Sequence, residues 1–329
     1  MAAVKSPFIV AACLLLVVAV AAATSGAVSS SSSYNPTVAL SGWLYGKAVN
    51  CNRTSIENWS CETCQNISGM KDVRVFHNET TGGQAYVGFN EVSNTLVVTF
   101  RGSVDIQNWI NNLDFFFIDY PNSDCTTFNG GSSCQVHRGF LNVYESIKFE
   151  GLLSYVNSLW TSVKSKSPSV LVTGHSLGGA LAILGGVDVT LLLRDQTSDI
   201  HVYTYGEPRV GNPAWAKWVA ESVLIGGKQY RLTHESDPVP RLPPLEFGFL
   251  HVPHEVWYNN DLAGDHFTVC MDNATAEDYA NCENTQYAFD TSDHLKKAVH
   301  MFLLPRRQQT CNTNSLFQKK NPTFTFFMF

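Results

Sequence analysis

The sequence predicts an α/β fold built around a mostly parallel sheet with helices on its flanks. Short runs rich in β-branched residues alternate with longer runs of helical periodicity, an order typical of strands joined by helical crossovers. The best strands are expected over residues 96–100, 170–173, 201–205 and 230–233, and the longest helices over residues 140–162 and 177–194. We find no internal repeat and no second domain boundary, so one sizeable domain is expected.

Length, composition and charge agree with a globular protein. The 329 residues can bury a large core, and 44% of them are hydrophobic against 15% that are charged. The formal net charge of −6 provides no basic surface for nucleic acid. We therefore expect no nucleic-acid partner.

The N-terminal segment has the layout of a signal peptide. Lys5 precedes an apolar stretch over residues 8–23, which ends in small residues. A membrane anchor is the alternative, but the stretch is short for a spanning helix and a Ser-rich segment follows it. We expect a signal peptide over residues 1–23, a Ser-rich linker over residues 24–39, and secretion.

The cysteines agree with export. Removal of Cys13 with the signal peptide leaves an even set that can pair completely in an oxidising compartment: Cys51, Cys61, Cys64, Cys125, Cys134, Cys270, Cys282 and Cys311. Cys61 and Cys64 also form a C-x-x-C motif of the kind found in redox and zinc sites. Because no second C-x-x-C accompanies it, we favour disulfides and expect neither a metal nor a cofactor.

Five N-x-S/T sequons are candidate glycosylation sites if the chain enters the secretory pathway. They lie at Asn52, Asn58, Asn66, Asn78 and Asn273. Several would arise by chance in a chain rich in Asn, Ser and Thr, so they add little evidence.

A glycine-rich sequence between an expected strand and helix identifies a candidate nucleophile. Residues 174–180 read G-H-S-L-G-G-A. A serine that attacks an ester must project from a strained turn, and small neighbours let the strand and helix approach closely. The G-x-S-x-G pattern alone is weak, but its position between strand and helix favours Ser176 as the nucleophile. His175 is expected to be structural, because adjacent residues in such a turn point apart.

Four motifs in one order carry a family resemblance. They read F-R-G-S at residues 100–103, G-H-S-L-G-G at 174–179, Y-G-E-P-R-V-G-N at 205–212 and S-D-P-V-P-R-L-P-P at 236–244. Together they resemble the class 3 lipases typified by secreted fungal triacylglycerol lipases. The resemblance implies an α/β-hydrolase fold with a catalytic domain over residues 40–311. It assigns no role to the C-terminal extension over residues 312–329.

The resemblance also implies a catalytic triad in the chain order Ser, Asp, His. Asp237 matches the acid, because it follows the strand over residues 230–233 and begins a Pro-rich loop. The alternative is an Asp that only forms a turn before Pro. With the resemblance, we expect Asp237 to be the catalytic acid.

The histidine of the triad must lie beyond Asp237. His294 ends the sequence D-T-S-D-H and directly precedes an amphipathic run at residues 295–299, so it matches the loop position of the family's base. His251 and His254 are the fallback, because they lie in a stretch that resembles a structural segment of the family.

Two groups are expected to stabilise the oxyanion of the tetrahedral intermediate. One is the backbone N–H of Leu177, the residue after the nucleophile. By resemblance, the other donor comes from Ser103. Arg101 is expected to brace this loop through hydrogen bonds, and the H-R-G-F sequence at residues 137–140 is expected to be scaffold near the site.

A short apolar stripe follows Ser103. Ile106, Trp109, Ile110 and Leu113 have the i, i+3, i+4, i+7 spacing of one helix face. Periodicity alone favours an ordinary surface helix that packs on the core. In the lipases that the chain resembles, the same position holds a mobile lid that covers the nucleophile in water, so we expect a lid here.

The resemblance suggests a cysteine pairing, although connectivity does not follow from sequence. Family-like positions suggest Cys51 with Cys311 and Cys125 with Cys134. Cys61 with Cys64 and Cys270 with Cys282 are the local remainder.

These expectations converge on a secreted serine ester hydrolase that acts on lipid esters at an oil–water or membrane interface. Triacylglycerol lipase is the first expectation, and the alternatives are a phospholipase A1 or a feruloyl-type carboxylesterase. A remote alternative is a lipid-binding protein without catalysis, which would need none of the triad residues. No obligate protein partner is implied.

Overall fold

A mixed sheet organises the computed structural model, which describes residues 34–226, 228–259, 267–270, 282–283 and 290–294. Within these residues the strand order is β1-β2-β3-β6-β7-β8-β9-β10. The strands are β1 Met70–His77, β2 Gln84–Asn90, β3 Thr95–Phe100, β6 Ser169–His175, β7 Ile200–Tyr205, β8 Gln229–His234, β9 Glu255–Tyr258 and β10 Thr268–Val269. β3, β6, β7, β8 and β9 run parallel, and β1, β2 and β10 add antiparallel edges.

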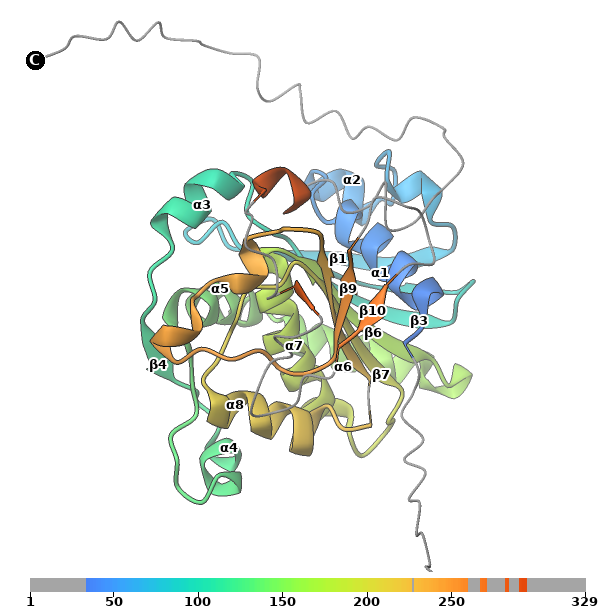
Figure 1. Cartoon of the computed structure of the whole chain (residues 1–329). Coiled ribbons are helices and arrows are strands. Elements are labelled where there is room, and N and C mark those ends of the chain that lie inside the picture. Colours follow the sequence, from blue (N-terminus) through green and yellow to red (C-terminus); the bar gives the residue numbers. More distant parts are fainter. Residues whose placement is uncertain (1–33, 227, 260–266, 271–281, 284–289, 295–329) are drawn as a thin grey trace, which may run out of the picture. The chain divides into compact units, whose positions relative to one another are not determined.

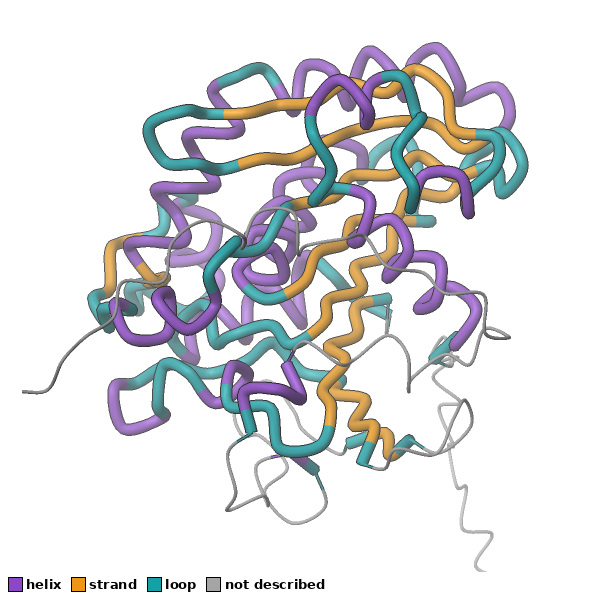
Figure 2. The backbone as a smooth tube through the Cα atoms, turned by 90° about the horizontal axis from the view of Figure 1, so that it is seen from above, coloured by secondary structure: helices purple, strands orange, loops and turns teal. Residues whose placement is uncertain are grey.

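Helices cover both faces of the sheet (Figures 1 and 2). They are α1 Pro36–Ala48, α2 Arg53–Glu57, α3 Ile106–Asn112, α4 Ser123–Phe128, α5 Arg138–Phe149, α6 Leu152–Val163, α7 Leu177–Leu193 and α8 Pro213–Trp218. Short helical turns are η1 Cys64–Asn66, η2 Lys164–Lys166, η3 Val219–Val223, η4 Val239–Arg241 and η5 Leu245–Phe247. A separate ribbon pairs β4 Phe117–Asp119 with β5 Gln135–His137.

The alternation of side chains along the central strands creates two apolar cores. Val98 of β3 and Val172 of β6 join the core that contains α5, α6 and α7, whereas Val97 and Leu171 join the core beneath α1. Successive residues of a strand point to opposite faces, so strands buried on both sides read as continuous apolar runs. The mostly parallel central sheet with helices on both faces confirms the predicted fold class. The four strands expected from sequence are β3, β6, β7 and β8.

The long helix expected over residues 140–162 is wrong, because the chain forms two helices there. Gly151 has φ 92° and separates α5 from α6. Glycine adopts this left-handed conformation without the steric cost that a Cβ imposes. The apolar periodicity continues across the break, which is why the pattern alone predicted one helix.

The boundary expected between linker and domain also needs correction. Helix α1 begins at Pro36, so the last residues of the linker assigned to 24–39 are helical. The Asn35 side chain accepts hydrogen bonds from the backbone N–H groups of Thr37 and Val38, and a proline at the first helical position is pre-organised for the turn. The expected signal peptide and residues 312–329 lie outside the described residues. None of the described helices combines the length and apolar character that crossing a membrane requires.

Three of the four expected disulfides are present among the described residues. They join Cys61 to Cys64, Cys125 to Cys134 and Cys270 to Cys282. Cys311 lies outside the described residues, so its bridge to Cys51 stays a prediction. Of the sequons, Asn52, Asn58 and Asn66 are exposed and Asn78 is half-buried, while Asn273 lies outside the described residues.

Two phenylalanines test the core assignment. Phe100 is fully buried and its ring reaches α7 at Gly185, whereas Phe149 is 90% exposed. Phe100→Ala should lower the free energy of unfolding by about 3–5 kcal/mol because it leaves a cavity. Phe149→Ala should change it by less than about 0.5 kcal/mol. Denaturant titration followed by tryptophan fluorescence measures both, and equal losses would contradict the core.

Candidate active site

Ser176 occupies a strained turn between β6 and α7. Its backbone has φ 60° and ψ −129°, an uncommon conformation for a residue other than glycine that costs about 1–3 kcal/mol. The backbone N–H of Ser176 donates to the Tyr205 carbonyl over 2.9 Å, which ties the turn to the neighbouring strand β7. The Ser176 hydroxyl is buried and makes no hydrogen bond within the described part of the chain.

Glycines make the turn possible because three backbone segments touch there. A Cβ on Gly178 would lie 2.4 Å from the Phe100 carbonyl oxygen, and one on Gly102 would lie 2.6 Å from the His175 carbonyl oxygen. Neither contact is compatible with a larger residue. The ends of β3 and β6 and the first turn of α7 therefore meet at Ser176.

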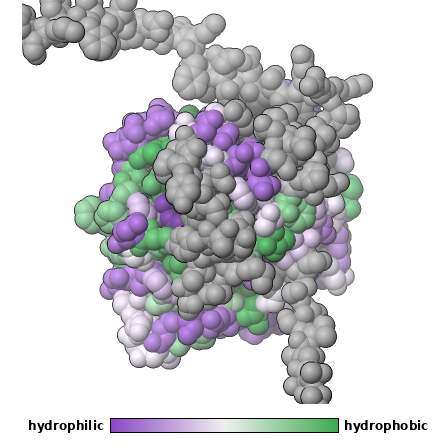
Figure 3. All heavy atoms as spheres, in the orientation of Figure 1, coloured by the Kyte–Doolittle hydropathy of each residue, from purple (hydrophilic) through white to green (hydrophobic). Residues whose placement is uncertain are grey.

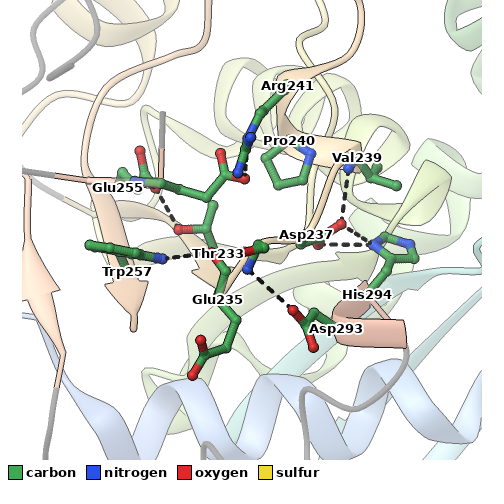
Figure 4. A network of polar contacts seen from close by, with 12 residues as sticks. Thr233, Glu235, Asp237, Val239, Pro240, Arg241, Glu255, Trp257, Asp293 and His294 are labelled. Atoms are coloured by element: carbon green, nitrogen blue, oxygen red, sulfur yellow. Dashed lines mark hydrogen bonds and ion pairs between the residues drawn. The ribbon is translucent and has the colours of Figure 1, made fainter. Parts of the chain in front are cut away.

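Asp237 and His294 form a fully buried pair (Figure 4). The Nδ1 atom of His294 lies 2.9 and 3.0 Å from the two carboxylate oxygens of Asp237. One of these oxygens also accepts the backbone N–H of Val239 over 2.9 Å, which fixes the carboxylate. Asp237 is brought to this position by β8, after which it starts the Pro-rich loop.

Arg209 holds the loop that carries Asp237. Its guanidinium donates to the carbonyls of Arg241 and Pro243 over 2.5 and 3.1 Å, and its backbone N–H donates to Leu242 over 2.7 Å. The sequence placed Arg209 in a family motif, but no local pattern indicates which loop its side chain supports.

The segment of His294 is attached to the same loop. The Asp293 carboxylate points toward the chain just before Asp237 (Figure 4), where it accepts the Ser236 N–H over 3.3 Å. The Asp290 N–H donates to the Ser236 carbonyl over 3.1 Å. Residues 291–294 are helical, which corrects the expectation of a loop, because Asp290 accepts the Ser292 N–H over 2.8 Å and caps the turn.

His175 supports His294 from the other side. Their ring centroids are 4.5 Å apart, and the His175 Nε2 lies 3.0 Å from the His294 carbonyl oxygen. His175 is thus a direct neighbour of His294, and its structural role stays a prediction. The fallback histidine His251 contacts the Pro-rich loop elsewhere, since its Nε2 lies 2.8 Å from the Pro240 carbonyl.

A cavity of about 550 Å³ opens beside the turn. Its walls come from the 81–83 loop, the 101–105 loop, α3, α5 and the start of α7, and both expected oxyanion residues, Ser103 and Leu177, line it. Arg101 donates to the Gly82 carbonyl over 2.6 Å, so it braces one wall as expected. His137 lines another wall, and burial lowers the pKa of its imidazole despite a hydrogen bond to the Asp114 carbonyl.

The expected lid segment forms α3 and lies along this cavity. Ile106, Trp109, Ile110 and Leu113 are all half-buried, and the intervening polar residues of the helix are exposed. The Trp109 ring stacks on Phe140 of α5 with 6.1 Å between ring centroids. The stripe thus faces the protein, while α3 itself has no fully buried residue.

Two buried carboxyl groups near the site were not anticipated from sequence. Burial raises the pKa of Glu207 to about 7, against the opposing effects of Thr204 and Arg231, and Glu207 packs on Gly179 of α7. Burial, with Glu255 nearby, raises the pKa of Glu283 to about 8, although Arg241 lies 2.8 Å away. Local sequence carries no signal for burial of this kind.

One group of candidate metal ligands exists among the described residues, and it does not fit a metal. Glu255, Cys270 and Cys282 place ligand atoms within 4.8 Å of one another. Cys270 and Cys282 are joined in a disulfide, so their sulfurs are not thiolates that can bind a cation.

The parallel strands, the turn at Ser176 and the buried acid–histidine pair define an α/β-hydrolase. The profile of the family described as Lipase (class 3) matches residues 97–247. A solved structure of Rhizomucor miehei triacylglyceride lipase is 31% identical with a TM-score of 0.65, covering 81% of this chain and 94% of that chain. The chain therefore belongs to the class 3 lipase family.

Two curated relatives support the assignment to this family. The secreted mono- and diacylglycerol lipase 1 of Fusarium solani is 34% identical over 229 residues, which cover 68% of this chain and 60% of the relative. The lipase of Rhizomucor miehei is 34% identical over 242 residues, which cover 72% of this chain and 61% of the relative. The chain thus spans about 60% of the length of these relatives.

Glu207 should make stability depend on pH. The unfolded carboxyl ionises near pH 4.5, whereas the folded one keeps its proton until about pH 7, so the folded state loses stability as the pH rises through this window. Glu207→Gln stays neutral and should avoid this loss, which amounts to about 3 kcal/mol. Denaturant titrations of both proteins across the window measure it. Parallel stability curves would contradict the raised pKa.

Proposed function

We propose that this chain is a secreted serine hydrolase that cleaves lipid esters, with Ser176, Asp237 and His294 as its triad. The observation that carries the proposal is the fully buried contact between Asp237 and His294. The His294 ring lies 4.5 Å from the ring of His175, the residue before Ser176 in the strained turn. A buried carboxylate beside an imidazole is suited to stabilise the charged imidazolium that forms when the base takes a proton.

In the proposed reaction, His294 takes the proton of the Ser176 hydroxyl as this attacks the ester carbonyl. Because Nδ1 of His294 faces Asp237, Nε2 is the atom left for the proton transfer. The proton then passes to the departing alcohol, which leaves an acyl-enzyme on Ser176. Water, activated by His294 in the same way, releases the acid.

The oxyanion of each tetrahedral intermediate would be bound by the backbone N–H of Leu177 and by Ser103. Leu177 is the first residue of α7, a helix of 17 residues, so its N–H lies at the positive end of the helix dipole. One donor of this kind typically contributes about 3 kcal/mol to the transition state. Both residues line the cavity, where the ester must lie.

Triacylglycerol is the substrate that we propose first. The Rhizomucor miehei structure is of a triacylglyceride lipase, and a further structure, 33% identical, is of a triacylglycerol lipase whose catalytic centre is a serine protease triad. The Fusarium solani relative is named as secreted, which agrees with the signal peptide expected here. A phospholipase A1 and a feruloyl-type esterase stay the alternatives on the same scaffold.

Partial glycerides are a second candidate substrate. Asp105, Asn108 and Asn112 of the α3 segment line the cavity, and the free hydroxyl of a mono- or diacylglycerol can hydrogen-bond to polar groups of this kind. The Fusarium solani relative carries the name of a mono- and diacylglycerol lipase.

A substrate panel decides between these candidates. Purified mature protein is assayed on emulsified triolein, diolein, phosphatidylcholine and methyl ferulate at matched concentration. Hydrolysis of triolein or diolein supports the proposal and ranks the two glycerides. Exclusive hydrolysis of phosphatidylcholine or methyl ferulate would replace it with the corresponding alternative.

Triad substitutions should abolish turnover without unfolding the protein. Ser176→Ala and His294→Ala should each reduce kcat by roughly 10⁴–10⁶-fold, because triad members act as a unit. Stopped assays on a soluble ester measure the residual rate, and thermal unfolding checks the fold. His251→Ala and His254→Ala serve as comparisons: if they lost activity while His294→Ala kept it, the base would be misassigned.

The proposed lid predicts interfacial activation. Opening α3 exposes its apolar stripe and costs free energy unless an apolar phase receives it. Activity on a short-chain triglyceride should therefore rise steeply once the substrate forms droplets. Trp109→Ser should weaken that rise more than it weakens hydrolysis of soluble p-nitrophenyl acetate. A smooth saturation curve through the solubility limit, unchanged in the variant, would leave α3 as an ordinary surface helix.

A further inference from the structure

A buried hydrogen bond joins Arg241, at the end of the turn after Asp237, to Glu283. The Arg241 Nε–H donates to a Glu283 carboxyl oxygen over 2.8 Å, and the two side chains are only 11% and 2% exposed. Hydrophilic residues occupy much of the described surface that is visible in Figure 3, where water solvates them. Because a buried guanidinium that loses its acceptor is costly, this contact holds Arg241 in one place.

Glu283 is itself attached to the edge of the sheet. Its backbone N–H donates to the Glu255 carboxyl of β9 over 3.4 Å, and the same oxygen of Glu255 accepts the Thr233 hydroxyl of β8. The Cys270–Cys282 disulfide fixes the residue before Glu283, and the Cys270 N–H donates to the Glu255 carbonyl over 3.0 Å. Two independent links therefore hold Glu283 to β9.

The other end of the contact belongs to the turn that holds Asp237. Arg241 is the last residue of η4, and its N–H donates to the Pro238 carbonyl over 3.1 Å. The first residue of η4 is Val239, whose N–H donates to the Asp237 carboxylate over 2.9 Å. Figure 4 shows Arg241 on one side of Asp237 and His294 on the other. A shift of Arg241 would therefore move the donor that fixes the Asp237 carboxylate.

The groups around Glu283 keep its carboxyl protonated at neutral pH. Burial and the neighbouring Glu255 raise the pKa of Glu283 to about 8, against the opposing effect of Arg241 and with a further contribution from Asp237. A protonated carboxyl still offers its carbonyl oxygen to the Nε–H of Arg241. The guanidinium carries a positive charge, so without this acceptor it would turn to a carboxylate such as Asp237.

We propose that Glu283 is a positioning residue for the acid of the proposed triad. By accepting the Arg241 Nε–H, it fixes η4 so that the Val239 N–H holds the Asp237 carboxylate against His294. It also gives the guanidinium an acceptor other than that carboxylate. This role rests on the proposed function, because Asp237 affects a reaction only if the triad does.

Kinetics of the full-length protein on soluble p-nitrophenyl acetate test this role. Glu283→Ala removes the acceptor and should lower kcat by about 10- to 100-fold, because a small displacement within the triad slows the chemical step. KM should change by less than about twofold, since Glu283 is not among the residues that line the cavity. Glu283→Gln keeps an oxygen acceptor and a neutral side chain of the same length, so it should restore kcat to within about threefold of the parent.

The pH profile of kcat/KM separates positioning from a general loss of structure. Its rising limb reports the pKa of the base in the free enzyme, which is His294 in the proposed triad. The ionisable groups next to this imidazole are Asp237, His175 and the adjacent Asp293. A released guanidinium near Asp237 disfavours the charged imidazolium, so Glu283→Ala should move the limb to lower pH by about half a unit or more.

Asp188→Ala is the matched control. The Asp188 carboxylate accepts the Tyr144 hydroxyl over 2.7 Å and the Lys148 ammonium over 3.1 Å, in the half of α7 away from Ser176. Its loss should lower thermal stability and leave kcat and the limb unchanged. If Glu283→Ala does not fold, Glu283→Asp decides, because it keeps the carboxyl but withdraws it by a methylene group; kcat should then fall by about fivefold or more.

Three results would overturn the positioning role. They are an unchanged kcat in Glu283→Ala or, in its place, Glu283→Asp; a loss that Glu283→Gln does not restore; and a loss that Asp188→Ala matches without movement of the limb. Ser176→Ala keeps the two proposals apart, since hydrolysis that survives it contradicts the proposed function alone. In that case the downfield proton resonance of the His294 Nδ1–H, recorded in the Ser176→Ala background, tests the contact without activity. Glu283→Ala should shift or broaden this resonance and Asp188→Ala should not, whereas a resonance unchanged by Glu283→Ala would overturn the role.

Discussion

The close approach of three backbone segments at Ser176 is the constraint on which the rest of the structure depends. The serine keeps φ 60° only because β6 and α7 are fixed around it, and glycine at 102 and 178 lets β3 and α7 come within contact distance. The strain of the turn must be offset by the central core, in which α7 contributes mostly buried residues. The site therefore requires the parallel sheet, because the sheet and the helix packed on it hold the turn in its strained conformation.

The second part of the site depends on polar contacts that burial makes strong. Asp237 and His294 are separated by 57 residues, and their contact forms where the Pro-rich loop meets the segment that ends at His294. Arg209 holds one side of this junction and Asp293 the other. Because these groups are shielded from water, each hydrogen bond is stronger than on the surface, and each would be costly to leave unpaired.

The surface around the cavity follows a different principle. The α3 stripe keeps its apolar side against the protein, while the rings of Phe116 and Phe247 are exposed to water. Exposed apolar area has a free-energy cost that only an apolar partner removes. A protein that works in water and at lipid would place such area around the entrance to its site.

Local sequence by itself determined the central strands, the helix after Ser176 and the turn between them, because periodicity and glycine spacing act over a few residues. The family resemblance supplied Asp237 and His294 as candidates, and the tertiary structure places them in contact. The break at Gly151 escaped prediction because apolar periodicity continues through it. The burial of Glu207 and the contact between the Phe115 and Phe247 rings were decided by the tertiary structure alone. Burial and long-range contact depend on which distant segments meet, and no short window of sequence contains that information.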